Sequence, residues 1–366
     1  MTSAPTFRVE RNAAPRPTSE REAVMAAPGF GVEFTDHMVT VQWTPERGWH
    51  DGVVQPFGPL PVLPGASALQ YAQQVFEGLK AYRHPDGSIW TFRPDRNAAR
   101  LQASARRFSL PAPDEALFLE SLTRLVAEDA AWVPDPAGER SLYLRPYVIG
   151  TEQFLGVRPS QEALYGVIAS PAGAYVGDIN RPADVWLSED HVRASPGGTG
   201  EAKYGGNYAA GLAAYADAKA NGCQQTAYLD AETRTWVEEF GGMNVMFVTD
   251  DGHLVTPELT GTILRGITRE SLLQLAAEGL GLVVEERRVS VQEWRERVQD
   301  GSFTEVFACG TAALITPVGT LKSRTFTLAP ARATAGEVTR TLRRALTDVQ
   351  YGRVPDSRGW MVRLQP

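Results

Sequence analysis

The chain is 366 residues long, with 43% hydrophobic and 22% charged residues, a composition that excludes a disordered or fibrous protein. A formal net charge of −7 disfavours a nucleic-acid-binding protein, which would normally carry a basic surplus. No apolar run approaches the roughly 18 residues that a membrane helix needs, so we expect neither a nucleic-acid nor a membrane partner. The length favours two domains.

Cysteine and histidine usage disfavours disulfide and metal chemistry. Cys223 and Cys309 stand in no CxxC or Cys/His spacing, and the five histidines are scattered singly. We therefore expect no metal site, and a reducing compartment, the cytoplasm.

The first half of the chain predicts an arm and then a domain that mixes strands with helices. Residues 1–30 are rich in Ala, Pro and Arg without an apolar stretch, which indicates an N-terminal arm rather than a secretory signal. The domain is expected over 31–174. Alternating apolar runs predict its strands, and helical spacing of apolar residues predicts its two helices. The strands are expected at 39–43, 88–92, 141–150 and 163–176, and the helices at 93–110 and 115–133.

The second half predicts a linker and a second, larger domain. Residues 175–184 carry Gly, Asn, Pro and charge without periodicity, which is typical of a linker, and the domain is expected over 185–366. Ser290 and Glu293 form a capping box that opens a helix. Strands are expected at 185–195, 227–230, 235–240 and 244–250, and helices at 207–222, 266–279 and 333–351. The pattern predicts a mixed α/β (α+β) fold.

A glycine-dense loop around Lys203 is the most informative stretch. Five glycines in ten residues, 197–206, surround this lysine. Glycines let the backbone approach a ligand closely. A lysine that attacks a carbonyl needs desolvation or a cationic neighbour, because its free pKa is about 10.4. The alternative is a mobile surface loop with a solvated lysine.

Two further segments are candidates for binding a heterocycle nitrogen and a phosphate. A predicted strand delivers Glu238 and Glu239 to a Gly-Gly break, and one of the two acids faces inward because neighbours on a strand point to opposite faces. Such an acid pairs with a protonated heterocycle nitrogen, or else lies at a solvated strand edge. Residues 264–270 open a helix whose free N–H groups suit a phosphate, although an ordinary helix start has the same sequence.

Together these residues resemble the branched-chain amino acid aminotransferases, fold-type-IV enzymes that use pyridoxal phosphate (PLP). The resemblance extends from about Gly31 to Val362 through seven ordered motifs. These are FEGLKAYR, FRPDRNAARL, WVPDPAG with SLYLRPYVIGTE, GGTGEAKYGGNY, EEFGGMN, LTGTILRGITRESL and EVFACGTAALITPV. The implied fold has a small α/β sandwich domain, a larger domain with a barrel-like sheet, and PLP between them.

The resemblance implies a role for each cofactor residue. Lys203 matches the lysine that binds PLP covalently and moves the proton between substrate and cofactor. Glu239 matches the acid at the pyridine nitrogen, with Glu238 as the open alternative. Tyr208 would bind the phenolic oxygen. The phosphate would be held by Arg100, Gly266, Ile267, Thr268 and Thr311.

The resemblance also implies a substrate pocket that accepts both a branched apolar side chain and the distal carboxylate of glutamate. Its aromatic walls match Tyr71, Phe76 and Tyr175. Tyr143 and Arg145 match the polar pair for the distal carboxylate, to which a guanidinium offers two N–H groups. The α-carboxylate would lie against the backbone N–H groups of Thr311 and Ala312.

Two departures from the family pattern change what we expect. The CxxC pair of the animal enzymes is absent after Thr311, so thiol regulation of that kind is not expected. A glycine, Gly242, stands where those enzymes have a threonine whose hydroxyl helps to hold the carboxylate. Carboxylate binding would then depend more on backbone donors.

The expected activity is PLP-dependent exchange of amino groups between leucine, isoleucine or valine and 2-oxoglutarate by a homodimer. Within the same fold, D-amino acid aminotransferase and aminodeoxychorismate lyase are the alternatives, although those enzymes generally lack the long motifs around Arg145 and Lys203. An alternative of another class is a non-catalytic protein that binds a phosphorylated metabolite. Such a protein would require neither Lys203 nor Glu239.

Overall fold

The computed structural model describes residues 6–173 and 179–365. The chain divides into two compact units. Unit 1 comprises Met1–Tyr175, Ala202–Gly205 and Asp348–Pro366, and unit 2 comprises Val176–Glu201 and Gly206–Thr347. Lys203 therefore belongs to unit 1, although the residues before and after its short segment belong to unit 2.

Unit 1 is built on one mixed sheet, nine-stranded within the described residues. The pair β1–β3 is parallel and the other pairs are antiparallel. The strand order is β1 (Arg8–Val9), β3 (Gly48–Pro56), β2 (His37–Thr44), β8 (Ala163–Ala172), β7 (Ser141–Gly150), β5 (Leu79–Arg83), β6 (Ile89–Phe92) and β18 (Met361–Gln365), with β4 (Gln74–Phe76) paired to β7.

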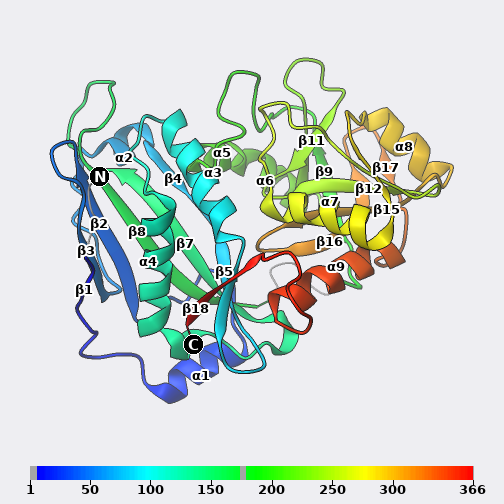
Figure 1. The fold of residues 1–366 in the computed structure, drawn as a ribbon. Coiled ribbons are helices and arrows are strands. Elements are labelled where there is room, and N and C mark those ends of the chain that lie inside the picture. The colour runs from blue at the N-terminus through cyan, green and yellow to red at the C-terminus, as the bar shows by residue number, and fades with distance from the viewer. Residues whose placement is uncertain (1–5, 174–178, 366) are drawn as a thin grey trace. The chain divides into compact units, whose positions relative to one another are not determined.

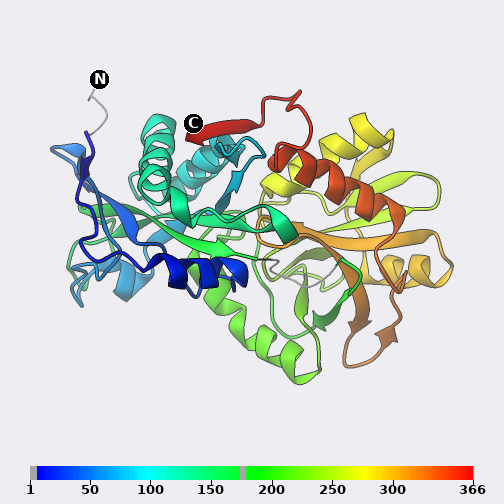
Figure 2. The ribbon, with the colours of Figure 1, turned by 90° about the horizontal axis from the view of Figure 1, so that it is seen from below.

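Two longer helices cover one face of this sheet. α3 (Pro94–Arg107) and α4 (Glu115–Glu128) lie together beside the strands in Figure 1, and α4 contacts β2, β8 and β18. α4 begins after Asp114, whose side chain accepts a hydrogen bond from the Leu117 N–H at 2.8 Å, as a helix N-cap does. Figure 2 shows α1 (Thr18–Ala26) on the other side of the sheet from α4. The shorter helices of this unit are α2 (Ser67–Tyr71), η1 (Ala130–Trp132) and η2 (Ala137–Glu139).

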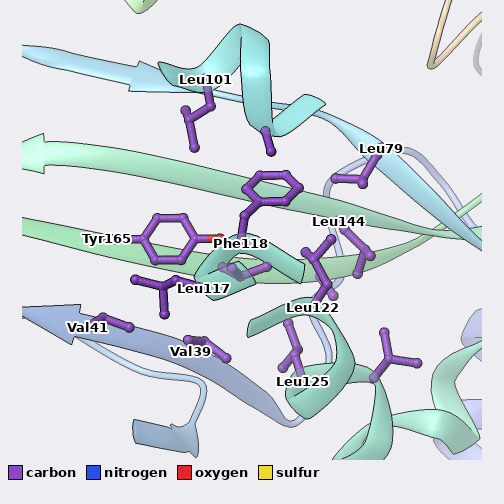
Figure 3. Packing of buried hydrophobic residues seen from close by; sticks show 14 of the residues in the cluster. Val39, Val41, Leu79, Leu101, Leu117, Phe118, Leu122, Leu125, Leu144 and Tyr165 are labelled. Carbon is purple, nitrogen blue, oxygen red and sulfur yellow. The ribbon is translucent and has the colours of Figure 1, made fainter. Parts of the chain in front are cut away.

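The core of unit 1 lies between α4 and the sheet. Figure 3 shows Phe118, Leu122 and Leu125 of α4 directed at strand residues that include Val39 and Leu144. All five side chains are completely buried. The apolar spacing predicted from the sequence is the spacing of this buried face.

Truncating the centre of this core should destabilise the protein strongly. We expect Phe118→Ala to lower the free energy of unfolding by about 3–5 kcal/mol, because the buried ring is lost and a cavity remains. Urea denaturation monitored by circular dichroism measures the change. Glu115→Ala, on the exposed side of α4, is the matched control and should stay within about 0.5 kcal/mol of the parent. Equal effects of the two substitutions would contradict this assignment of the core.

Unit 2 contains a second sheet, also nine-stranded within the described residues, that curls into a half-barrel. The larger domain was predicted to have a barrel-like sheet, and this prediction is confirmed. The pairs β9–β10, β9–β16 and β13–β14 are parallel. The order is β11 (Val237–Phe240), β10 (Gln225–Leu229), β9 (Ala183–Ser188), β16 (Leu314–Lys322), β15 (Phe303–Gly310), β12 (Asn244–Thr249), β13 (His253–Thr256) and β14 (Val283–Glu286), with β17 (Thr327–Leu328) paired to β16.

The second half of the chain confirms one local prediction, for a helix, and corrects two, one for a helix and one for a strand. Ser290 accepts a hydrogen bond from the Glu293 N–H at 2.9 Å, which confirms the helix start predicted there. The single helix expected over 207–222 is divided at Gly211 into two helices. The strand expected over 185–195 ends at Ser188, because the Ser188 hydroxyl turns the chain by bonding the His191 carbonyl. The helices are α5 (Gly205–Ala210), α6 (Leu212–Ala220), α7 (Ile267–Leu280), α8 (Val291–Gln299) and α9 (Glu337–Gln350).

These helices pack on the second sheet at several places. α6 contacts β9 and β10, α7 contacts β14 and β15, and α8 contacts β15 (Figure 1). No helix within the described residues is both long and apolar enough to cross a membrane.

Candidate active site

Lys203 is held by its backbone against unit 1. Its N–H donates to the Ser104 hydroxyl at 2.9 Å, and its carbonyl accepts from the Phe76 N–H at 3.0 Å. The ammonium lies 4.9 Å from the centre of the Phe76 ring, within the range of a cation–π contact. The side chain is half-buried rather than fully solvated. The lysine of the glycine-dense loop is therefore anchored to a folded surface at both its backbone groups.

The charge of Lys203 acts on a buried ion pair nearby. Glu77 is completely buried, and both of its carboxylate oxygens accept from the Arg100 guanidinium, at 2.7 and 2.9 Å. The Asn97 amide donates to the same carboxylate at 2.7 Å. Burial alone would raise the pKa of Glu77, but the charges of Arg100 and Lys203 and these hydrogen bonds lower it below its usual value. The network fixes the orientation of Arg100.

Three of the predicted substrate residues lie together in unit 1. Tyr143 and Arg145 are two residues apart on β7 and so face the same side of the sheet. The Arg145 guanidinium lies 4.7 Å from the centre of the Phe76 ring and donates to the Tyr143 hydroxyl at 3.4 Å. Arg145 Nε is buried without a hydrogen-bond partner among the described residues. Phe76 thus has two cationic groups beside it, from Arg145 and Lys203.

The other two predicted aromatic walls are placed differently. Tyr71, at the end of α2, is 38% exposed, and its hydroxyl donates to the Leu155 carbonyl. Its ring stacks on Phe154 at 6.2 Å. Leu155 and Val157 beside it are 77% and 90% exposed. Tyr175 lies outside the described residues.

In unit 2, Glu239 is buried, and its partners include the Leu264 N–H and the Arg193 guanidinium. One of its oxygens accepts from the Leu264 N–H at 2.8 Å and lies 2.7 Å from the Arg193 guanidinium. Arg193 also donates to the carbonyls of Gly200 and Thr262. Glu239 is therefore joined to the loop that leads into α7 and, through Arg193, to the glycine-dense loop.

The neighbouring acid, Glu238, has different partners. Its Oε1 accepts from the Thr262 hydroxyl, and its Oε2 has no hydrogen-bond partner among the described residues. The side chain is only 6% exposed. Burial raises the pKa of Glu238 above its usual value, more than the Thr262 hydrogen bond and the charge of Arg193 lower it.

The raised pKa of Glu238 predicts a pH-dependent loss of stability. A carboxyl whose pKa is raised on folding contributes its full stability below its unfolded value and loses it as the pH rises through the folded value. We therefore expect Glu238→Gln to be more stable than the parent at neutral pH, with the difference shrinking toward about pH 4. Thermal unfolding across this range is the measurement. A Glu238→Gln protein that is less stable at neutral pH would contradict this reasoning.

The start of α7 has the features of an anion site. Its N-cap residue is Gly266, and no described side chain caps the helix by a hydrogen bond. Ile267 and Thr268 form its first turn and are buried. A side chain at Gly266 would collide with the Asn244 amide, which itself donates to the Leu264 carbonyl at 3.0 Å. The predicted phosphate residues 266–268 are therefore a helix start with free backbone donors, which is the local geometry that phosphates favour.

The remaining predicted residues of unit 2 lie on short connections. Thr311 and Ala312 form part of the tight turn between β15 and β16. Tyr208 is half-buried in α5, where Asn207 exchanges hydrogen bonds with Thr199 of the glycine-dense loop. Gly242 follows β11, and a side chain there would meet no described atom within 4 Å. The space around Gly242 would therefore allow a side chain with a hydroxyl group.

Two site residues were not predicted from the sequence. Glu77 stands inside the motif FEGLKAYR, but the family resemblance implies no role for it. Its neighbour Gly78 must lack a side chain because Tyr143 occupies that space. Arg193 lies in no recognised motif, and only its place beside Glu239 reveals it. The signal available for Glu77 was an acid flanked by an aromatic residue and a glycine, three residues from a lysine.

A family model and two sequence relatives all indicate an aminotransferase. The family model for the class IV aminotransferases matches residues 74–321. The probable branched-chain-amino-acid aminotransferase of Streptomyces coelicolor is 55% identical over 98% of this chain and 99% of its own. The branched-chain-amino-acid aminotransferase of Mycolicibacterium smegmatis is 54% identical, and the match covers both chains completely.

Solved structures of a branched-chain amino acid aminotransferase are also similar. The T.th. enzyme with pyridoxamine 5′-phosphate has a TM-score of 0.72 and 29% identity, over 89% of this chain and 98% of that one. The same enzyme has been solved with N-(5′-phosphopyridoxyl)-L-glutamate and with 4-methylvaleric acid, each with a TM-score of 0.71. The predicted fold type is confirmed by this likeness.

Proposed function

The chain belongs to the class IV aminotransferases, and from that premise we propose that it is a PLP-dependent branched-chain amino acid aminotransferase. It exchanges the amino groups of leucine, isoleucine and valine with 2-oxoglutarate. The single observation that carries this proposal is the arrangement around Phe76. One aromatic ring there is flanked by the amine of Lys203 and the guanidinium of Arg145, a group that suits a carboxylate.

The residues of this chain fit PLP by three independent features. The start of α7 offers backbone N–H groups beside Gly266, where a side chain would fit only if Asn244 moved. Glu239 presents a buried carboxylate that suits a protonated ring nitrogen. Arg100 presents a guanidinium oriented by Glu77. We assign the phosphate to Arg100, residues 266–268 and Thr311, the phenolic oxygen to Tyr208, and the aldehyde to Lys203.

Each residue has one task in the proposed reaction. When bound, PLP supplies an electron sink for the pair of electrons left at the substrate α-carbon. Lys203 would accept and return the proton of the substrate α-carbon. Glu239 keeps the proton on the pyridine nitrogen, which makes the ring a better acceptor. The charge of Glu77 beside Arg100 and Lys203 balances two cations that would otherwise repel each other.

Two kinds of substrate must use one pocket. Phe76 provides an apolar wall for a branched side chain, and Tyr143 with Arg145 binds the distal carboxylate of glutamate. The backbone N–H groups of Thr311 and Ala312 hold the α-carboxylate. The T.th. enzyme, solved with a glutamate adduct and with a methyl-branched acid, supports this dual use.

A substrate panel tests the proposal. L-Leucine, L-isoleucine and L-valine should each give glutamate from 2-oxoglutarate, whereas D-alanine and aminodeoxychorismate should not react. Turnover of D-alanine or aminodeoxychorismate in preference to L-leucine would favour one of the other enzymes of this fold. PLP binding without any turnover would favour a non-catalytic binding protein.

We further propose that the enzyme is a cytoplasmic homodimer. The exposed apolar side chains of Tyr71, Leu155 and Val157 support a subunit contact, because a second copy would remove them from water. Cys223 and Cys309 are both free and buried, as expected in a reducing compartment. Burial raises the pKa of Cys309 to about 12, which makes this thiol unreactive. Sedimentation equilibrium should give the mass of two chains.

A further inference from the structure

Unit 2 contains a pocket that the proposed reaction does not use. It encloses about 480 Å³ of space, a figure that includes open solvent at its mouth. Pro196, Ala231, Trp236, Pro257 and Ile263 supply its apolar walls. Glu239, Gly266 and Thr311 are not among its lining residues.

Glu238 lines this pocket and is the residue that gives it a chemical preference. Strand residues alternate, so Glu238 faces the other side of β11 from Glu239, which is bound by Leu264 and Arg193. Its Oε2 is buried without a hydrogen-bond partner among the described residues. An unsatisfied buried carboxylate oxygen destabilises a folded protein unless a donor reaches it. The missing partner is therefore a donor.

The charges around the pocket indicate that this donor is a cation. Four carboxyl side chains line it, from Asp230, Glu232, Glu238 and Glu258, against one guanidinium, that of Arg288. Arg288 is already engaged, because it lies 3.2 Å from Glu258 and over the Trp236 ring. Such a surface attracts positive ligands and repels anions.

The other acids are less suited to bind a ligand directly. Asp230 accepts backbone hydrogen bonds from Thr233, Thr235 and Trp236, and these hold its own turn. They outweigh its burial and lower the pKa of Asp230 to about 2. Glu258 is paired with Arg288, and Glu232 is exposed. Glu238 is therefore the lining carboxylate with an unsatisfied oxygen, Oε2, that a ligand could bind.

A metal ion is a poor candidate for this partner. No group of three or more His, Cys, Asp or Glu side chains in the described ranges is arranged to hold one. The apolar walls and the Trp236 ring are instead suited to the carbon body of an organic ligand, and an aromatic face also attracts cations.

We propose that this pocket is a second binding site, which takes a small organic cation with a guanidinium or ammonium group on a short apolar body. The cationic group donates to Glu238 Oε2, and the body packs between Trp236, Pro257 and Ile263. The site is separate from the residues assigned to PLP, so its occupancy does not depend on transamination.

Isothermal titration of the PLP-loaded protein with n-butylguanidinium tests this proposal. This probe is used because a primary amine would also react with the cofactor aldehyde. n-Butylurea, which has nearly the same shape without the charge, is the matched neutral probe. We expect n-butylguanidinium to bind at least about tenfold more tightly than n-butylurea, the difference that a charged hydrogen bond makes.

Two variants locate the site. Glu238→Gln should weaken n-butylguanidinium binding by at least about tenfold. Glu232→Gln makes the same chemical change at an exposed lining residue and should weaken binding by less than about threefold, because exposed ion pairs contribute little. Equal affinity for the two probes, no saturable binding of n-butylguanidinium, or unchanged binding in Glu238→Gln would each overturn the proposal. The probe comparison uses the unmodified protein and so does not depend on how a variant folds.

Discussion

Replacing Lys203 by alanine should lower kcat for transamination of L-leucine by about 10⁴-fold or more. The substitution removes both the covalent attachment of PLP and the base that moves the α-proton. Because the Lys203 backbone contacts to Phe76 and Ser104 do not involve the side chain, the fold should persist. Glutamate formation measures the rate, and circular dichroism confirms the fold.

Lys219→Ala provides the matched control for this experiment. The chain has four lysines, at positions 80, 203, 219 and 322. Lys219 is exposed in the last turn of α6, so its loss should leave kcat within about twofold of the parent. A Lys203→Ala enzyme that retained a tenth of the parent rate would exclude this lysine as the catalytic base.

Replacing Glu239 by glutamine should lower kcat by about 10²–10³-fold. This is the typical cost of removing one group that stabilises charge in the transition state, here the carboxylate assigned to the pyridine nitrogen. The amide cannot keep a proton on the pyridine nitrogen by charge. The variant should also lose about 3–5 kcal/mol of stability, because the buried Arg193 would be left without its carboxylate. Steady-state kinetics at saturating PLP and urea denaturation measure the two effects.

Glu238→Gln decides which of the adjacent acids serves the cofactor. Glu238 bonds Thr262 on the other side of β11, so the kcat of Glu238→Gln should stay within about threefold of the parent. This comparison separates a cofactor contact from a general effect of charge on β11. A larger loss in Glu238→Gln than in Glu239→Gln would reverse the assignment.

Much of the fold followed from patterns that are local in sequence. The apolar spacing of residues 115–128 forecast the buried face of α4, and Ser290 with Glu293 marked the start of α8, because both signals act within one helix. The break at Gly211 and the end of β9 at Ser188 were missed. Each depends on how the chain turns in three dimensions, which periodicity does not encode.

The site residues also fall into those that the sequence indicates and those that only the structure reveals. Residue types beside glycines indicate Lys203, the adjacent acids Glu238 and Glu239, and the start of α7, and the choice of Glu239 between the two acids comes from the family resemblance. Glu77 and Arg193 were not selected, because their significance lies in partners distant along the chain, Arg100 and Glu239. The role of Glu238 could not be foreseen either, since alternation on a strand says that two acids diverge but not which of them is left unsatisfied.

The absorption spectrum of the purified protein before and after addition of L-leucine, without any 2-oxo acid, tests the central claim most directly. The account predicts a coloured protein whose Schiff-base band disappears with L-leucine, with one equivalent of the branched 2-oxo acid formed per chain, and returns when 2-oxoglutarate is added. Borohydride reduction should leave the cofactor on the peptide that contains Lys203. A colourless protein, or a band that L-leucine leaves unchanged, would contradict the account.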